Sequence, residues 1–373
     1  MNQVIPESMK PSFERTAHPF YMWEELMGTP EALRTLLKSD LGEHIQKAAE
    51  ALKKVDSVHL TGCGTSYFSS IASTYFFHRI VGIPAQAHNS FEFSAYPPAG
   101  LSKSALIAIS HTGGTGVALD SVDIAEKEGA VCVGLTDVED SALVSKVPHV
   151  LLGGGTREKP LPKTRSYVTS LLKHYLLAIE VANLKGRKFE TNFTKYFEEL
   201  PDTVQEVLDN NLQLTKEIVQ ALDRHAQIYL FGAGPNLATV MEGTLKLQET
   251  AQAQAHSFEL EEGMHGPWVT MNSGDLVIVY APSGPSYEKA VQFVKAIDKV
   301  GAKVWILSNN SGEIEGADYV TPLPNVPELI SPLYGILPIY EFAYELSLAR
   351  GIRPDVMRLT DERYLDARLK LPR

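Results

Sequence analysis

Two short segments, His59–Gly64 (HLTGCG) and Tyr229–Gly234 (YLFGAG), share one pattern 170 residues apart: an apolar run that ends in Gly-x-Gly. A second pair follows in the same order, since Ala105–Gly113 (ALIAISHTG) matches Leu276–Gly284 (LVIVYAPSG) at an offset of 171. Collinear matches at a nearly constant offset indicate that the chain contains two copies of one structural plan. The competing explanation is that buried strands of α/β proteins resemble one another anyway.

A third pair, Gly129–Thr136 and Gly301–Ser308, continues the repeat at an offset of 172. Short apolar runs without alternation are typical of strands covered on both faces of a parallel sheet. Helical patterns follow these strands at Ser69–Ile80, Val117–Glu128 and Ser286–Val300. We therefore expect an α/β fold with two doubly wound parallel sheets in tandem and helices on both faces of each.

The length of 373 residues agrees with two domains. Hydrophobic residues make up 44% and charged residues 21%, as in ordinary globular proteins. No apolar run approaches the ~20 residues of a membrane helix, and the polar N-terminus lacks a signal core. Cys63 and Cys132 lie in unlike surroundings, so we expect reduced thiols and a cytoplasmic protein. The expected parts are an N-terminal arm with the first helices (1–40), a phosphate-binding domain (41–195), a domain with the acid–base groups (196–353) and a tail over the active site (354–373).

The net charge is −11, with 45 acidic and 34 basic residues. Basic clusters with interleaved aromatic residues, which nucleic-acid-binding proteins use, do not occur in the sequence. We therefore expect neither nucleic acid nor membrane as a partner. An anionic small molecule would need a local site of neutral hydrogen-bond donors.

Two hydroxyl-rich loops could provide such a site. Gly62–Ser66 and Ser110–Thr115 each follow a predicted strand and lead into a predicted helix. Glycines let the backbone approach a ligand, and helix starts offer free N–H donors, so these loops favour a small phosphate monoester. The lysine of a nucleotide-binding P-loop is missing and Tyr67 replaces the third glycine of a dinucleotide site, so we expect no cofactor. The simpler alternative is that the hydroxyls only cap helices.

Acid–base groups are concentrated in the second copy. Glu242, Lys246 and Glu249 are spaced to share one helix face among apolar neighbours, where ionised groups are costly unless they are paired or used. His265, between glycine residues, could transfer protons near neutral pH. A solvated ion pair and an ordinary loop histidine are the alternatives. No HxH or HExxH spacing supports a metal site.

These segments together resemble a known family. The chain is similar to tandem sugar isomerase (SIS) domain proteins, and in particular to the isomerase half of glucosamine-6-phosphate synthase, from Tyr21 to about Pro354. The matching stretches are Tyr21-Met22 with Glu25, Pro30-Glu31-Ala32, Cys63-Gly64-Thr65-Ser66, Ile109-Ser110-His111-Thr112-Gly113, Thr164-Arg165-Ser166-Tyr167, Glu242 to Glu249 and His265-Gly266-Pro267.

The resemblance implies roles for individual residues. It implies that the sugar phosphate is held by Ser66, Ser110, His111, Thr112 and Thr115, with further substrate contacts from Gly64, Thr65 and Thr164. In the family, glutamine and serine are usual at the positions of His111 and Thr112.

The acid–base roles also follow from the resemblance. Glu249 would move a proton between C1 and C2, Glu242 and Lys246 would line the site, and His265 would open the sugar ring. In the family this histidine reaches a neighbouring subunit's site, so a homodimer with shared active sites is expected.

The departures from the family affect the expected reaction. A glutamine-hydrolysing domain with its N-terminal cysteine is not in this sequence, and the family's imine-forming tail lysine falls at Glu362 or Ala367. Arg368 cannot form an imine because arginine stays protonated, which leaves Lys370 as a weak substitute. We expect an enzyme that isomerises, deaminates or deglycates a sugar or amino-sugar 6-phosphate. A non-catalytic phosphosugar sensor and a synthase completed by a separate glutaminase subunit are the alternatives.

Overall fold

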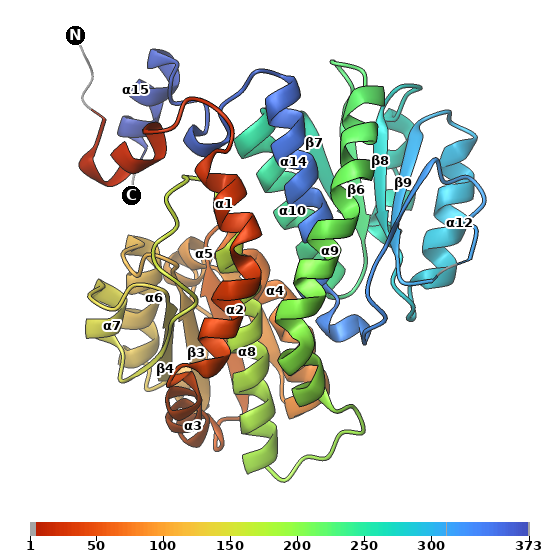
Figure 1. Cartoon of the computed structure of the whole chain (residues 1–373). Helices are drawn as coiled ribbons and strands as arrows, with labels where there is room; N and C mark the ends of the chain where they lie inside the picture. Colours follow the sequence, from red (N-terminus) through yellow and green to blue (C-terminus); the bar gives the residue numbers. More distant parts are fainter. Residues whose placement is uncertain (1–4, 311, 372–373) are drawn as a thin grey trace. The chain divides into compact units, whose positions relative to one another are not determined.

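The computed structural model describes residues 5–310 and 312–371 and confirms the predicted α/β class, with two five-stranded parallel sheets (Figure 1). The strand orders are β2-β1-β3-β4-β5 and β7-β6-β8-β9-β10, so both sheets follow the same doubly wound plan. The strands are β1 Ser57–Gly62, β2 Ala85–Asn89, β3 Ser104–Ile109, β4 Val131–Thr136, β5 His149–Leu152, β6 Ile228–Gly232, β7 Ala255–Glu259, β8 Leu276–Tyr280, β9 Lys303–Ser308 and β10 Tyr319–Pro322.

The chain divides into two compact units. The first-sheet unit consists of Thr29–Glu158 and Arg165–Pro201. The second-sheet unit takes the segment up to Gly28, residues 159–164 and the chain from Asp202 onward. The division falls within α9 (Phe193–Ala221). The domain bounds expected from the sequence stay predictions.

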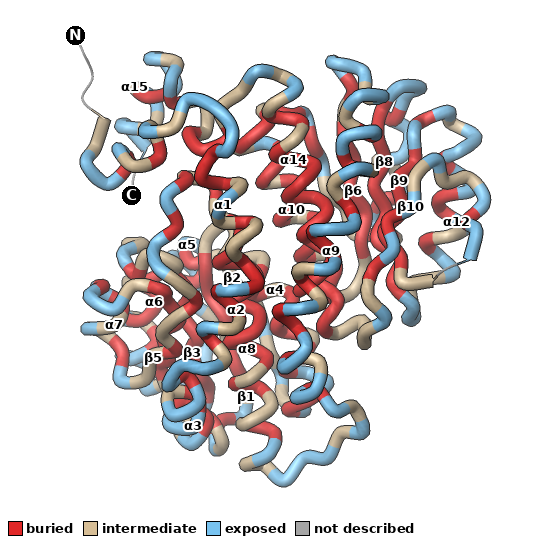
Figure 2. The backbone as a smooth tube through the Cα atoms, in the orientation of Figure 1, coloured by how far each residue is buried: buried red, intermediate tan, exposed pale blue. Residues whose placement is uncertain are grey.

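In the first-sheet unit, all residues of β3 are buried because helices cover both faces of the sheet. α3 (Leu41–Leu52), α4 (Thr65–Phe76) and α8 (Arg165–Leu184) pack together on one face. α5 (Ser90–Ala95), α6 (Gly116–Lys127) and α7 (Ala142–Lys146) belong to the other face. α2 (Thr29–Lys38) packs against α8. The strands and the inward sides of the helices form the buried core (Figure 2).

In the second-sheet unit, β6 and β8 are buried along their whole length. α10 (Asn236–Ala251) packs on α14 (Leu337–Ala349), and α12 (Tyr287–Asp298) covers the apolar cluster on the other face. The shorter elements are α11 Leu260–Met264, α13 Pro332–Gly335, η4 Pro267–Thr270 and η5 Glu328–Ile330.

The described segments near the N- and C-termini pack within the second-sheet unit. The carboxylate of Asp355 accepts hydrogen bonds from the N–H groups of Tyr21 and Met22, each at 2.9 Å, and so fixes the start of α1 (Tyr21–Met27). Met9 in η1 (Glu7–Phe13) forms a small buried cluster with Leu359 and Leu365, which lies in α15 (Glu362–Lys370). The tail therefore has an apolar anchor.

The repeat extends to backbone conformation. Gly64 and Gly234 both have positive φ, 54° and 55°, directly after β1 and β6. A Cβ atom on Gly62 would lie 2.6 Å from the backbone of Ser66, and one on Gly232 would lie 2.5 Å from that of Asn236. The same glycines are therefore required in both copies, because the helix turns back close to the strand end.

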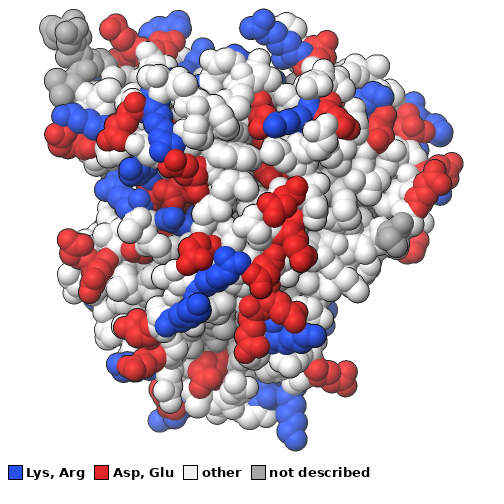
Figure 3. All heavy atoms as spheres, in the orientation of Figure 1, with Lys and Arg blue, Asp and Glu red and all other residues white. Residues whose placement is uncertain are grey.

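The three predicted helices are observed within a few residues of their expected bounds, as α4, α6 and α12. Cys63 and Cys132 are free thiols. Among the described residues, no helix is both long and apolar enough to cross a bilayer. Acidic and basic side chains are interspersed on the face shown in Figure 3.

Candidate active site

The predicted phosphate loops leave the first sheet at its switch point. β1 lies between β2 and β3, so the connections after β1 and β3 depart in opposite directions. In doubly wound sheets, ligands bind outside the carboxyl ends of strands at this point. Because β1 and β3 are parallel neighbours, the fold brings Gly64, Thr65 and Ser66 to the same sheet edge as the loop Ser110–Thr115.

The geometry of these loops suits a small anion. α4 begins at Thr65 and α6 at Gly116, so two twelve-residue helices start at the switch point. The hydroxyl oxygens of Ser110 and Thr115 lie 2.9 Å apart. Gly113 has φ 64°, and a Cβ atom there would clash with the hydroxyl of Ser141. Free N–H groups at helix starts and grouped hydroxyls can hold a phosphate without a basic residue.

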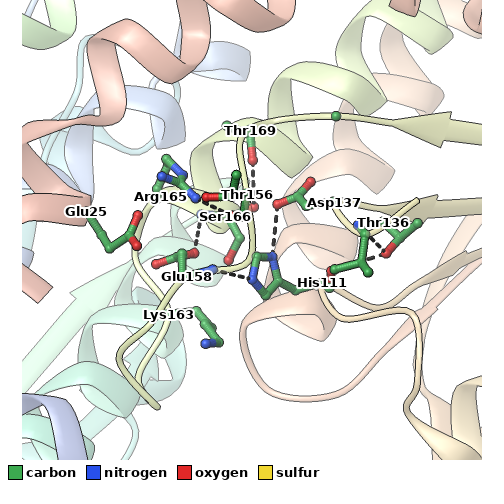
Figure 4. A network of polar contacts seen from close by, with 12 residues as sticks. Glu25, His111, Thr136, Asp137, Thr156, Glu158, Lys163, Arg165, Ser166 and Thr169 are labelled. Atoms are coloured by element: carbon green, nitrogen blue, oxygen red, sulfur yellow. Dashed lines mark hydrogen bonds and ion pairs between the residues drawn. The ribbon is translucent and has the colours of Figure 1, made fainter. Parts of the chain in front are cut away.

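His111 is tied to protein groups through both ring nitrogens (Figure 4). The backbone N–H of Glu158 points to Nε2 at 3.3 Å, and Nδ1 lies 2.9 Å from Oδ2 of Asp137. A backbone N–H can only donate, so Nε2 accepts and Nδ1 carries the proton that it donates to Asp137. The side chain thus fixes the loop, and its role as a phosphate donor stays a prediction.

Behind His111 lies a buried ion pair that the sequence reading missed. Nζ of Lys173 contacts Oδ1 of Asp137 at 2.6 Å and the carbonyl oxygens of Gly153 at 2.5 Å and Thr136 at 3.3 Å. Burial opposes ionisation of Asp137, but Lys173 and His111 hold its pKa below the usual value. The sequence does contain a feature that could have indicated this buried pair, namely a lysine inside the apolar stretch LLKHYLL of α8.

Glu158 and Thr164 belong to the segment that precedes α8. Oε1 of Glu158 accepts a hydrogen bond from the N–H of Ser166 at 2.9 Å and so caps the first turn of α8 (Figure 4). Thr164 is fully buried, and it groups with the second-sheet unit, unlike the other predicted phosphate and substrate contacts. Its expected substrate contact stays a prediction.

In the second-sheet unit, Glu242, Lys246 and Glu249 share one face of α10, as their spacing predicted. Nζ of Lys246 lies 2.5 Å from Oε2 of Glu249 and 3.5 Å from Oε1 of Glu242. The hydroxyl of Tyr340 donates to Oε1 of Glu242 at 2.9 Å. The side chains of Glu242 and Lys246 are 0% and 1% exposed, whereas Glu249 is 15% exposed. The group is therefore no solvated surface pair.

Glu249 lines a pocket of about 460 Å³. The tail contributes Met357, Arg358 and Tyr364 to its wall, and the guanidinium of Arg358 lies 4.0 Å from the ring centre of Tyr364. Met357 and Arg358 have positive φ, 48° and 63°. Non-glycine residues are uncommon in this conformation, which is concentrated at functional sites. Lys370 lies on α15, exposed and paired with Asp366 at 2.8 Å.

His265 is not among the residues that line this pocket. It ends α11, its side chain is 69% exposed, and Nε2 lies 3.2 Å from Oε1 of Glu261. Its expected action in a neighbouring subunit stays a prediction.

Comparison with known proteins agrees with this architecture. The glutamine–fructose-6-phosphate aminotransferase (isomerizing) of Gloeobacter violaceus is 25% identical over 356 residues, which cover 92% of this chain and 58% of that protein. The chain thus spans little more than half the length of this relative. The C-terminal domain of glucosamine-fructose-6-phosphate aminotransferase from Francisella tularensis superposes with a TM-score of 0.81 at 20% identity, covering 91% of this chain and 99% of that chain.

Glucosamine-6-phosphate deaminase from Thermotoga maritima superposes with a TM-score of 0.74 at 24% identity, covering 90% of this chain and 96% of that chain. At these identities the superpositions establish the fold. The SIS domain pattern itself matches twice, over residues 51–179 and 221–350, so the two matches fall on the two sheets described above. The chain therefore belongs to the SIS domain family.

Proposed function

We propose that the chain is an enzyme that moves a proton between C1 and C2 of an open-chain sugar or amino-sugar 6-phosphate. The observation that carries the proposal is the arrangement on α10. A buried lysine holds the carboxylate of Glu249 at 2.5 Å, and that carboxylate borders a pocket of about 460 Å³. A fixed, partly accessible carboxylate is the group that general-base catalysis at carbon needs.

The hydroxyl and N–H groups at the first switch point are the proposed phosphate contacts of the first-sheet unit, and Glu249 is the proposed base of the second-sheet unit. Glu249 takes the proton from the carbon next to the carbonyl or imine carbon, and an enediol or enolamine forms. The same carboxylate then returns the proton to the neighbouring carbon. His265 is assigned to ring opening, in the site of a partner subunit within a homodimer.

The substituents on the substrate decide the net reaction. Proton transfer in a sugar 6-phosphate interconverts aldose and ketose. In a 2-amino-sugar 6-phosphate, transfer of the proton from C2 to C1 yields a ketose imine at C2, and hydrolysis of that imine by water releases ammonia and leaves the ketose 6-phosphate. In a fructosamine 6-phosphate the proton transfer is followed by loss of the amine. The relatives with isomerising and deaminating names support this range of reactions.

The test is a panel of glucose, fructose, glucosamine and fructosamine 6-phosphates, with products identified by NMR. For the accepted substrate, Glu249→Gln should lower kcat by about 100- to 10,000-fold, the range of general acid–base catalysis. Its affinity for the phosphosugar should change little, because the phosphate contacts are untouched. Glu288→Gln, at an exposed position of α12, is the matched control.

Full activity of Glu249→Gln would refute the assignment of the base. Binding of a phosphosugar without any product from the whole panel would instead favour a sensor.

A further inference from the structure

The second-sheet unit repeats the switch point at which the first-sheet unit is proposed to hold phosphate. β6 lies between β7 and β8, so the loops that follow β6 and β8 meet at one sheet edge. α10 and α12 begin directly after these loops. The order of strands, loops and helices is the same as at the first switch point, and Gly234 has the positive φ of its counterpart Gly64.

A carboxylate of the chain itself lies at this second switch point. The hydroxyl of Ser286 donates to Oε1 of Glu328 at 3.2 Å. A Cβ atom on Gly284 would clash with the same carboxylate, and one on Gly234 would lie 4.0 Å from Oε1. Glu328 thus contacts the loop that follows β8 and faces Gly234 in the loop that follows β6.

The repeat identifies what these contacts correspond to in the first-sheet unit. At the offset of 171, Gly284 corresponds to Gly113 and Ser286 corresponds to Thr115. Thr115 supplies one of the hydroxyls of the predicted phosphate loop, whereas a Cβ atom on Gly113 would meet the side chain of Ser141. Because the Glu328 carboxylate accepts the hydroxyl of Ser286, it lies where the predicted phosphate would meet the hydroxyl of Thr115 in the other copy.

Glu328 has its own counterpart, Glu158, at an offset of 170. The two carboxylates are used differently. Oε1 of Glu158 accepts the N–H of Ser166 and caps α8. Glu328 instead accepts the Ser286 hydroxyl, and burial raises the pKa of its carboxyl although that hydrogen bond opposes the shift.

We propose that Glu328 is an internal substitute for phosphate, which closes the second switch point to phosphate monoesters and leaves one phosphosugar site per chain. The statement about the first site rests on the proposed function, whereas the closure of the second rests on Glu328 alone. Removing the carboxylate should open a latent anion site formed by the N–H groups at the starts of α10 and α12 and by the Ser286 hydroxyl.

The test is equilibrium dialysis of the full chain against radiolabelled inorganic phosphate. The wild type should bind one phosphate per chain, and Glu328→Ala and Glu328→Ser should each bind two. Glu328→Gln should stay at one, because the amide still fills the space. Glu313→Ala, at an exposed loop position, is a control that should also stay at one.

Two further variants separate the sites. Thr115→Ala should weaken phosphate binding only at the first switch point, which the wild type already uses. Ser286→Ala combined with Glu328→Ala should weaken phosphate binding only at the second switch point, which Glu328→Ala opens. The inference is overturned if folded Glu328→Ala and Glu328→Ser both bind the wild-type number, or if the additional phosphate is insensitive to Ser286→Ala. A wild type that binds none, with Glu328→Ala binding one, would count against the proposed phosphate site and leave the inference standing.

Discussion

Lys246 shows how single residues decide the chemistry of α10. Its ammonium group lies between two carboxylates, within 2.5 Å of Glu249 and 3.5 Å of Glu242. Two buried side chains, Lys246 and Glu242, and the partly exposed Glu249 satisfy one another's polar groups, and Glu249 borders a pocket. The sequence indicated the shared face from the spacing, but burial, which distinguishes this group from a surface ion pair, depends on α14 packing over α10.

A second carboxylate gives a prediction at the residue scale. Glu341 in α14 is fully buried, and Nδ2 of Asn211 donates to its Oε2 at 2.8 Å. Burial raises its pKa from 4.5 to about 8. The folded protein therefore holds a proton that the unfolded chain loses above pH 4.5, and stability falls as the pH rises through this window.

Glu341→Gln mimics the protonated form and should relieve that loss. We expect the variant to gain roughly 5 kcal/mol in unfolding free energy above pH 8 and little at pH 4.5. Urea unfolding at both pH values measures this. An equal gain in unfolding free energy of the variant over the wild type at both pH values would contradict the raised pKa of Glu341.

At the scale of elements, the buried Asp137–Lys173 pair joins α8 to the end of β4, where His111 is held. Lys173→Met would leave the Asp137 carboxylate buried without its main partner, so we expect a loss of about 3–5 kcal/mol in unfolding free energy. Lys295→Met, which removes an exposed pair with Glu315, should cost less than about 1 kcal/mol. Chemical denaturation of both variants is the measurement, and equal losses would contradict the account.

The elements differ in how far the sequence revealed them. The helical patterns predicted α4, α6 and α12, and the buried apolar runs predicted β1, β3, β4, β6, β8 and β9. The edge strands β2, β5, β7 and β10 were not predicted, because they have four or five residues and are only partly buried. The His111–Asp137–Lys173 network was also missed, since only the order of the strands brings the ends of β3 and β4 together.

At the scale of the whole molecule, the same strand order occurs in both sheets, but different groups lie at the two switch points. The first copy presents hydroxyls and helix starts at its switch point, and the second presents a carboxylate at the equivalent place. Sequence offsets alone pair Glu158 with Glu328, but only side-chain conformation shows that one caps a helix and the other turns to the switch point. The excess of acidic residues fits this plan, because the proposed phosphate site uses neutral donors and needs no basic patch.

The central claim is that this SIS protein transfers a proton between C1 and C2 with Glu249 as the base. Its most direct test is incubation of the wild type and Glu249→Gln with the accepted 6-phosphate in heavy water, with deuterium at C1 and C2 followed by NMR. We predict deuterium at these carbons with the wild type and a loss of at least about 100-fold in its rate of entry with Glu249→Gln. A phosphosugar that binds the wild type without exchange at either carbon, or equal exchange by the variant, would contradict the claim.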